Sequence, residues 1–213
     1  GLQWSGQTLY RHTRVVPLLA PHQTDVDPGR TDQRALLDGA ALRLRLSDAA
    51  LHERGAPAEP VERLVFELLE QLRTESLVPD DWPGVRHNLE GRFLRWCQAF
   101  MASGLTETSL GILMFTVAVV VWSRLTGHEV PEAMADRIEA TRAAVVPQIG
   151  SLLAGLRRHR TDQAAFLPVA LALSEWVGRT VRSAQAEVPD GAARARRRSG
   201  FAHEGGGRRA AGG

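Results

Sequence analysis

The chain has 213 residues, a formal net charge of +2 and 44% hydrophobic residues, which suits one globular domain with tails. All 26 basic residues are arginine. Residues 191–213 hold six arginines against one glutamate, which leaves 20 arginines against 23 acidic residues in 1–190. The body is therefore mildly acidic, and we expect no nucleic-acid partner. With a single cysteine, Cys97, no disulfide forms within the chain, which fits a reducing cytoplasm.

The first thirty residues predict an irregular arm. Scattered strand-forming residues between positions 2 and 16 are followed by Pro17, Pro21 and Pro28, which interrupt regular structure. A short hairpin is expected at Ser5-Gly6.

Three amphipathic helices are expected between residues 31 and 103. The first covers 31–54, with a buried face marked by Leu37, Leu44 and Leu51 and an end set by Gly55 and Pro57. The second covers 60–77 and the third 83–103, each with apolar residues at helical spacing.

The stretch from 105 to 125 is the most apolar part of the chain. It carries no charge from Thr108 to Ser123 and is hydrophobic on every side, which requires burial. Thr106 or Thr108 is expected to cap its start, and Gly127 to end it. Sixteen uncharged residues reach about 24 Å as a helix, less than the ~30 Å of a bilayer's hydrocarbon core. We therefore expect a central core helix, without a membrane partner.

The rest of the chain predicts further helices and a tail. A helix is expected over 131–146 with Pro131 as its first residue, a break or kink at Pro147, and a short helix over 148–158. Thr161 is expected to cap the last helix, and the Arg/Gly-rich segment 189–213 to form a disordered linker or tail. The fold prediction is all-α: a single bundle of six or seven helices over 31–188, around a buried central helix.

Motifs for catalysis or metal binding are missing from the sequence. GxxxxGK[ST], GxGxxG, HExxH, DxSxS and CxxC do not occur. The cluster His87, Asn88 and Glu90 is interpreted as a solvated first helical turn. We expect no catalytic, cofactor-binding or metal-binding residue in this chain, and whether it is an enzyme stays uncertain.

The densest charged group lies on the second expected helix and consists of Glu67, Glu70, Arg73 and Glu75. Glu67 and Glu70 are three residues apart, as in helical carboxylate metal sites, but no ExxH follows. A solvated face is the preferred interpretation, and these four residues are our candidate partner-docking surface. Alternatively, Arg73 bridges to an acidic group elsewhere and fixes the packing.

One family resemblance goes beyond composition. The segments that carry it are ALRLR at 41–45, DAALH at 48–52, VFELLEQLRTE at 65–75, the GVxxNL pattern at 84–89 and RLTG at 124–127. Glu70, Gln71, Arg73 and Glu75 stand where the family has EQxRxE. Over roughly 31–130 the chain resembles the N-terminal helical region of the CobT-type subunit of aerobic, ATP-dependent cobaltochelatase, or of a related von Willebrand factor A protein paired with a AAA+ ATPase.

The resemblance implies a non-catalytic protein-interaction domain. In that family the subunit pairs with a AAA+ ATPase subunit, and both act on a large chelatase subunit that inserts Co²⁺ during cobalamin biosynthesis. The family's divalent-ion site belongs to a C-terminal von Willebrand factor A domain with DxSxS, so no site residue carries over to this chain. The basic tail is similar to the linker before that domain.

Two other classes of function stay open at this point. The first is a stand-alone helical binding module or protein adaptor unrelated to cobalamin, with a cavity of roughly 300 Å³ or more for an apolar ligand beside Phe115 and Trp122. The second is an enzyme in its own right. The sequence also leaves open whether the chain forms a homo-oligomer and whether cobalt is involved.

Overall fold

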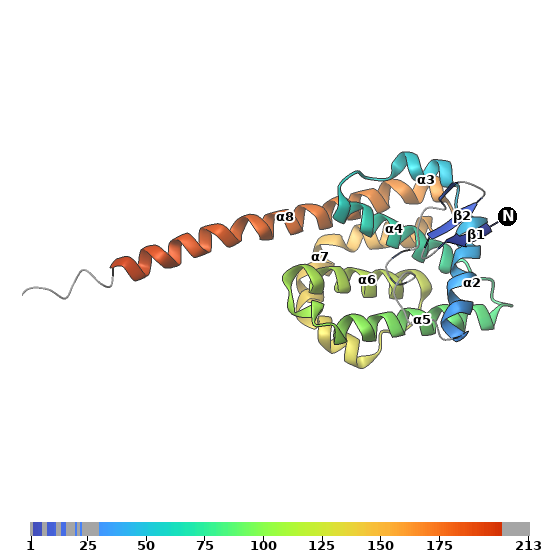
Figure 1. Cartoon of the computed structure of the whole chain (residues 1–213), viewed down its shortest axis with the longest axis horizontal. Coiled ribbons are helices and arrows are strands. Elements are labelled where there is room, and N and C mark those ends of the chain that lie inside the picture. Colours follow the sequence, from blue (N-terminus) through green and yellow to red (C-terminus); the bar gives the residue numbers. More distant parts are fainter. Residues whose placement is uncertain are drawn as a thin grey trace, which may run out of the picture. The chain divides into compact units, whose positions relative to one another are not determined.

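Helices make up most of the computed structural model, which describes residues 2–5, 8–11, 14–15, 20, 22 and 30–201 and the side chains of 20, 22 and 33–186 (Figure 1). The all-α prediction is confirmed. Two compact units are present, Gly1–Gly178 and Arg179–Gly213, and the boundary falls within the last helix. The described elements of the body are α2 (Arg30–Leu46), α3 (Ala49–Gly55), α4 (Pro60–Glu75), α5 (Pro83–Ala102), the 3₁₀ turn η1 (Leu105–Glu107), α6 (Ser109–Thr126), α7 (Glu132–His159) and the start of α8 (Gln163–Phe201).

The N-terminal arm contains a small antiparallel sheet. Its strands β1 (Leu2–Ser5), β2 (Thr8–Arg11) and β3 (Arg14–Val15) pair in the order β1-β2-β3. Ser5 pairs with Thr8, so the hairpin expected at Ser5-Gly6 is present. The three prolines expected to interrupt this arm lie outside the described residues.

The first expected helix is in fact two helices, α2 and α3. The Asp48 carboxylate accepts hydrogen bonds from the backbone N–H groups of Ala50 (2.9 Å) and Leu51 (3.0 Å), so it caps a new helix. The prediction that a leucine face is buried is also wrong, because Leu37 and Leu44 are 53% and 37% exposed. The buried face of α2 instead carries Ala35, Ala40, Leu42 and Arg43.

The central apolar helix, α6, is confirmed with the expected caps. The Thr108 hydroxyl accepts from the backbone N–H of Gly111 at 3.0 Å, and Gly127 ends the helix in the left-handed region at φ 82°. Side chains of α6 pack against α5 through stacked rings, with Phe93 and Trp122 4.6 Å apart and Phe100 and Phe115 5.4 Å apart, centroid to centroid. By length and hydropathy alone, α6 and residues Gln163–Ala186 of α8 are sufficient to cross a membrane, but more than half of α6 is buried inside the fold.

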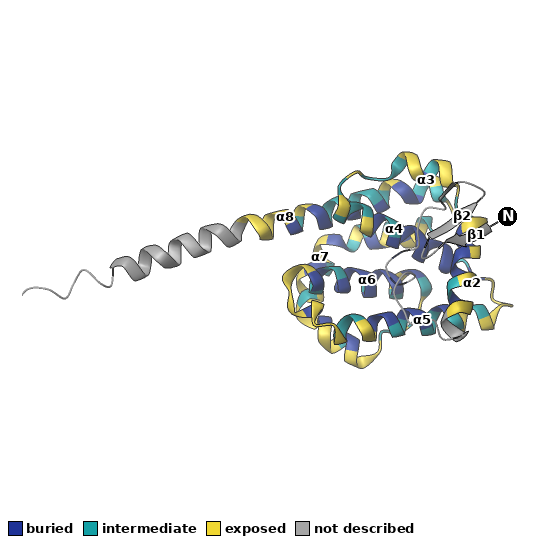
Figure 2. Ribbon diagram, in the orientation of Figure 1, coloured by how far each residue is buried: buried dark blue, intermediate teal, exposed yellow. Residues whose placement is uncertain are grey.

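Helix α4 shares the centre of the bundle with α6. Every residue from Leu68 to Glu75 is buried, and α4 packs against both α2 and α6. Figure 2 shows buried residues along α4 and α6, whereas α3 is mostly exposed. The second half of α4 therefore has no face toward solvent, although it contains four charged or amide side chains.

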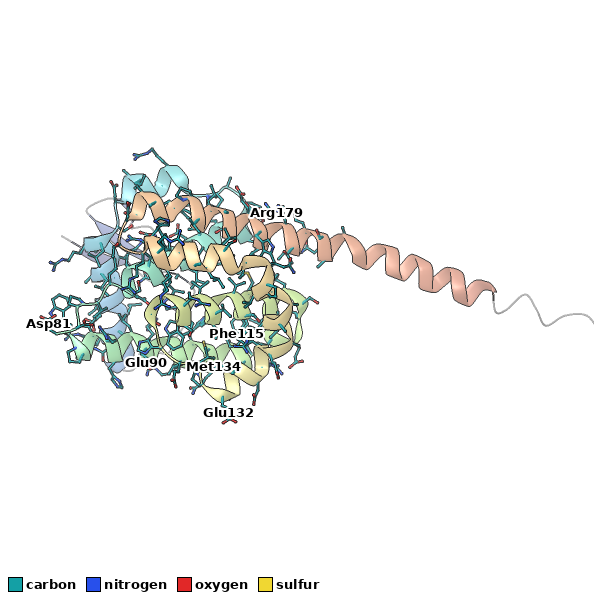
Figure 3. The ribbon with its side chains drawn as sticks, turned by 180° about the vertical axis from the view of Figure 1, so that it is seen from behind. Asp81, Glu90, Phe115, Glu132, Met134 and Arg179 are labelled. Carbon is teal, nitrogen blue, oxygen red and sulfur yellow. The ribbon has the colours of Figure 1, made fainter. Side chains whose placement is uncertain are left out.

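Helix α7 is continuous through Pro147, where the sequence predicts a break or a kink. Pro147 lies inside it, and Figures 1 and 3 show that the helix changes direction along its length. Proline removes one backbone hydrogen bond and bends a helix, but buried neighbours can hold both halves in place. Val145 and Ile149 do so here, at 6% and 0% exposed.

The bounds of the last two helices differ slightly from expectation. Pro131 is the N-cap of α7 and not its first residue. The Asp162 carboxylate accepts from the backbone N–H of Ala165 at 3.1 Å, so Asp162 caps α8 in place of Thr161. Helix α8 continues to Phe201, and residues 202–213 lie outside the described part, so disorder over 189–213 stays a prediction.

Candidate functional site

The charged group of α4 is an internal feature of the bundle. Side-chain exposure is 13% for Glu67, 1% for Glu70, 2% for Arg73 and 4% for Glu75. The interpretation of these residues as a solvated face is wrong, because α4 is covered by other helices along this half. A docking role for these side chains loses the exposure that it required.

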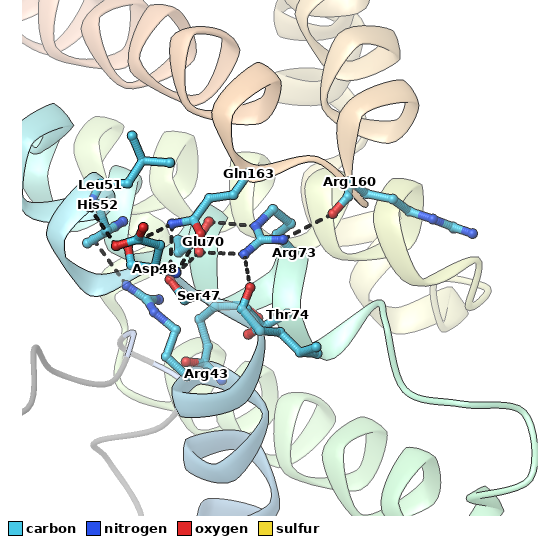
Figure 4. A network of polar contacts seen from close by, with 12 residues as sticks. Arg43, Ser47, Asp48, Leu51, His52, Glu70, Arg73, Thr74, Arg160 and Gln163 are labelled. Carbon is cyan, nitrogen blue, oxygen red and sulfur yellow. Dashed lines mark hydrogen bonds and ion pairs between the residues drawn. The ribbon is translucent and has the colours of Figure 1, made fainter.

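Arg73 holds three parts of the fold together (Figure 4). Its Nε and Nη2 donate to the Glu70 carboxylate, both at 2.7 Å. Nη2 also donates to the carbonyl of Leu46 at 2.7 Å, and Nη1 to the carbonyl of Arg160 at 3.2 Å. These two carbonyls end α2 and α7, where backbone acceptors lack partners within their own helix and a cation is favourable. The alternative that Arg73 fixes the packing is therefore supported, although its acidic partner lies on the same helix.

The Glu70 carboxylate extends this contact to the start of α8. The Ser47 hydroxyl donates to Glu70 Oε1 at 2.5 Å. Gln163 then contacts the turn between α2 and α3, since its Nε2 donates to Ser47 Oγ (3.2 Å) and its Oε1 accepts from the backbone N–H of Asp48 (2.6 Å). Gln163 thus contacts residues more than a hundred positions away, and Ser47 links it to the buried Glu70 carboxylate.

Glu67 has a separate set of partners one turn earlier. Arg43 Nη2 donates to its Oε2 at 2.8 Å, and His52 Nε2 lies 2.9 Å from its Oε1. Burial alone would raise the pKa of Glu67, but the hydrogen bonds and positive charges of His52 and Arg43 outweigh it and hold the pKa below its usual value. The His52 ring stacks on Phe66 with centroids 4.8 Å apart. These contacts join α2, α3 and α4.

The Glu75 carboxylate contacts a buried histidine that the sequence did not identify as a site residue. His22 is fully buried, and its Nε2 lies 3.1 and 3.2 Å from the two oxygens of the Glu75 carboxylate. Gln71 Nε2 donates to Glu75 Oε1 at 2.8 Å, and Arg92 Nε donates to the carbonyl of His22 at 3.0 Å. His22 lies in the proline-rich arm, where no periodic pattern marks a residue as buried.

In these three clusters the buried carboxylates are bound by other side chains of the same fold. The carboxylates of Glu67, Glu70 and Glu75 each contact an arginine, a histidine, an amide or a hydroxyl group. In the part of the chain that the structure describes, no three or more His, Cys, Asp or Glu side chains are grouped so that they could hold a metal ion. The geometry therefore supports a structural role, in which charge is used to connect helices.

The region proposed for an apolar ligand is filled by aromatic side chains. Phe115 is fully buried and contacts the rings of Trp96 and Phe100. A cavity of about 420 Å³ reaches Trp122, but Asp80, Arg86 and Glu90 are among its lining residues, so it does not suit an apolar ligand. Of the nearby histidine cluster, His87 is exposed, while the Glu90 carboxylate lies 3.3 Å from His128 Nδ1.

A smaller apolar groove lies along the first half of α6. Its volume is about 220 Å³, and Leu64, Trp96, Phe100, Leu105 and Leu110 are among its lining residues. Three of these are unusually open for leucine, with Leu64 44%, Leu105 49% and Leu110 41% exposed. Neither Phe115 nor Trp122 lines this groove, so it is not the cavity that the apolar-ligand hypothesis requires.

Fold and site together define an all-helical domain whose internal charges connect its helices. A model of the family described as cobalamin biosynthesis protein CobT matches residues 17–185, and the chain belongs to this family. The resemblance seen in the sequence is confirmed, and the match extends well beyond residue 130. No curated protein and no solved structure matches the chain. The family description assigns the protein to cobalamin biosynthesis.

Proposed function

We propose that this chain is a non-catalytic protein-interaction domain of a cobaltochelatase subunit, acting with a AAA+ ATPase subunit and a large chelatase subunit in cobalt insertion. The observation that carries the proposal is the CobT family match over residues 17–185, which includes nearly the whole helical body. In this role the domain binds other subunits in the cytoplasm and holds no cofactor of its own.

The internal use of charge supports this proposal. A domain that transmits force from an ATPase needs its helices fixed relative to one another. Ion pairs and the hydrogen bonds around them connect α2, α3 and α4, and Gln163 adds the start of α8 through hydrogen bonds. Breaking such pairs is costly because it leaves an uncompensated buried charge. In this role the partner subunits contact the outer surface of the bundle and not the buried charged group of α4.

The experiment combines the full chain with the purified ATPase and chelatase subunits from the same source. Calorimetry is expected to show binding to at least one subunit, and Co²⁺ insertion into the corrinoid substrate is expected to require the chain, ATP and both other subunits. Omitting the chain is the control. Cobalt insertion by the chain alone would show an enzyme, whereas no binding to either subunit would overturn the interaction role.

A further inference from the structure

A second groove lies at the bend of α7. It has a volume of about 670 Å³ and lies between the last turns of α6, the turn that follows and both halves of α7. Arg124, Arg142 and Arg157 all line it, and Pro147 lies between the last two of these in the chain. Two arginines fifteen positions apart on α7, on either side of Pro147, therefore line the same groove.

The positive charge of this groove is not balanced. No Asp or Glu is among its lining residues, and none of its three arginines forms an ion pair with another residue that the structure describes. Elsewhere exposed arginines do find acids, such as Arg86 with Asp80 and Arg137 with Glu107. Three arginines around one concave surface, with no carboxylate among its lining residues, create a positive field there that favours an acidic ligand.

The groove also has an apolar floor. Val120, Val130, Ile138, Val146 and Pro147 line the groove together with the three arginines, and we call these apolar residues its floor. An occupant that only carried phosphate would leave this floor uncovered. Stacking of nucleic-acid bases would need aromatic side chains, and no aromatic residue is among the lining residues. Carboxylates and apolar groups on one ligand would satisfy both the rim and the floor.

We propose that this groove docks an acidic amphipathic segment of a partner protein, with its carboxylates on Arg124, Arg142 and Arg157 and its apolar side chains on the valines and Pro147 between them. This inference rests on the proposed function and names the face that the interaction uses. Arginine is suited to such a contact, because its planar guanidinium binds carboxylates in a two-point geometry.

The test uses the full chain, a groove variant R124E/R142E/R157E and a matched variant R34E/R45E/R54E. All six arginines are exposed, and four of them lie in the last turn of their helices, so both variants change charge equally and lose comparable helix-end contacts. The matched variant also loses the ion pair of Arg34 with Asp38, which makes it the stricter control for folding. Circular dichroism melts check folding. If the groove variant does not fold, R124Q/R142Q/R157Q replaces it.

Binding of the chain to two probes is measured by fluorescence anisotropy and calorimetry. One is a synthetic helical peptide with glutamate and leucine at helical spacing, with its lysine counterpart as the negative control. The other is each purified chelatase partner. We expect the native chain to bind the acidic peptide and one partner, the groove variant to lose at least about tenfold in affinity for both, and the matched variant to stay within about twofold. Rising salt is expected to weaken binding by the native chain more than by the groove variant.

The outcomes separate the groove from the proposed function. Binding of the acidic peptide through the groove, without binding to either chelatase partner, would support the groove and overturn the chelatase role. Binding to a partner that both triple variants retain would overturn the groove and leave the proposed function standing. Failure of the native chain to bind the acidic peptide or either partner overturns both.

Discussion

Arg73 and Glu70 form a two-point ion pair inside the bundle, with both N–O distances at 2.7 Å and both side chains at most 2% exposed. The same guanidinium reaches the carbonyls that end α2 and α7. A pair that looks like an ordinary surface contact between neighbours on one helix is therefore a junction of three helices.

Replacing Arg73 by methionine is expected to lower the free energy of unfolding by about 3–5 kcal/mol, because Glu70 is then left buried without its cation. Urea denaturation of the native chain and R73M measures the change. The matched double variant E70L/R73M should recover part of the loss, since removal of both charges leaves no uncompensated carboxylate. A cost for R73M below about 1 kcal/mol, as for a surface pair, would show that the junction contributes little.

The lowered pKa of Glu67 predicts how the stability of the fold depends on pH. Its pKa is held below the ordinary value of 4.5 in the folded chain, because the contacts with His52 and Arg43 outweigh the effect of burial. A carboxyl group with a depressed folded-state pKa contributes stability that is complete above its unfolded pKa and disappears as the pH falls through the folded pKa. The free energy of unfolding should therefore decrease as the pH drops below about 4.5.

The variant E67Q isolates this contribution. It is expected to be less stable than the native chain at pH 7, and the difference between the two should shrink as the pH falls below about 4.5. Urea titrations at several pH values between 3 and 7 measure both curves. Parallel curves for E67Q and the native chain would show that another group controls the acid response.

The sequence predicts helix bounds correctly where the hydrophobic periodicity and the residues that begin or end helices agree. Helices α4, α5 and α6 begin and end within about two residues of expectation, because Pro60, Pro83, Thr108 and Gly127 mark their ends as elementary helix chemistry requires. The heptad of leucines in α2 was misleading for the opposite reason: it continues across Asp48, whose side chain starts a new helix.

The polar interior was beyond the reach of sequence patterns. A glutamate such as Glu70 is normally a sign of solvent exposure, and only the fold shows that Ser47 and Arg73 replace water around it. The buried partner of Glu75 is His22, which is 53 positions away in the chain. Contacts between residues so far apart in the chain depend on tertiary packing, so the sequence could not show that these side chains lie inside the bundle.

Cys97 should be chemically inert in the folded protein. Its side chain is fully buried, and burial raises the pKa of the thiol far above its usual value, so almost no reactive thiolate forms at pH 8. We expect Ellman's reagent to label less than about a tenth of the native chain in an hour and all of it in 8 M urea, because only the thiolate reacts. Rapid labelling without urea would indicate that α5 opens on this timescale.

Two glycines give a matched test of the turn before α6. A Cβ on Gly111 would collide with the carbonyl oxygen of Leu105 and lie 2.7 Å from its carbonyl carbon, whereas a Cβ on Gly150 in α7 would meet nothing within 4 Å. Since backbone cannot yield as a flexible side chain does, G111A is expected to cost about 1–3 kcal/mol of unfolding free energy. G150A should instead add about 0.5–1 kcal/mol, the advantage of alanine over glycine inside a helix. Urea denaturation of both variants measures the contrast, and equal stability of the two would mean that η1 shifts readily to admit a methyl group.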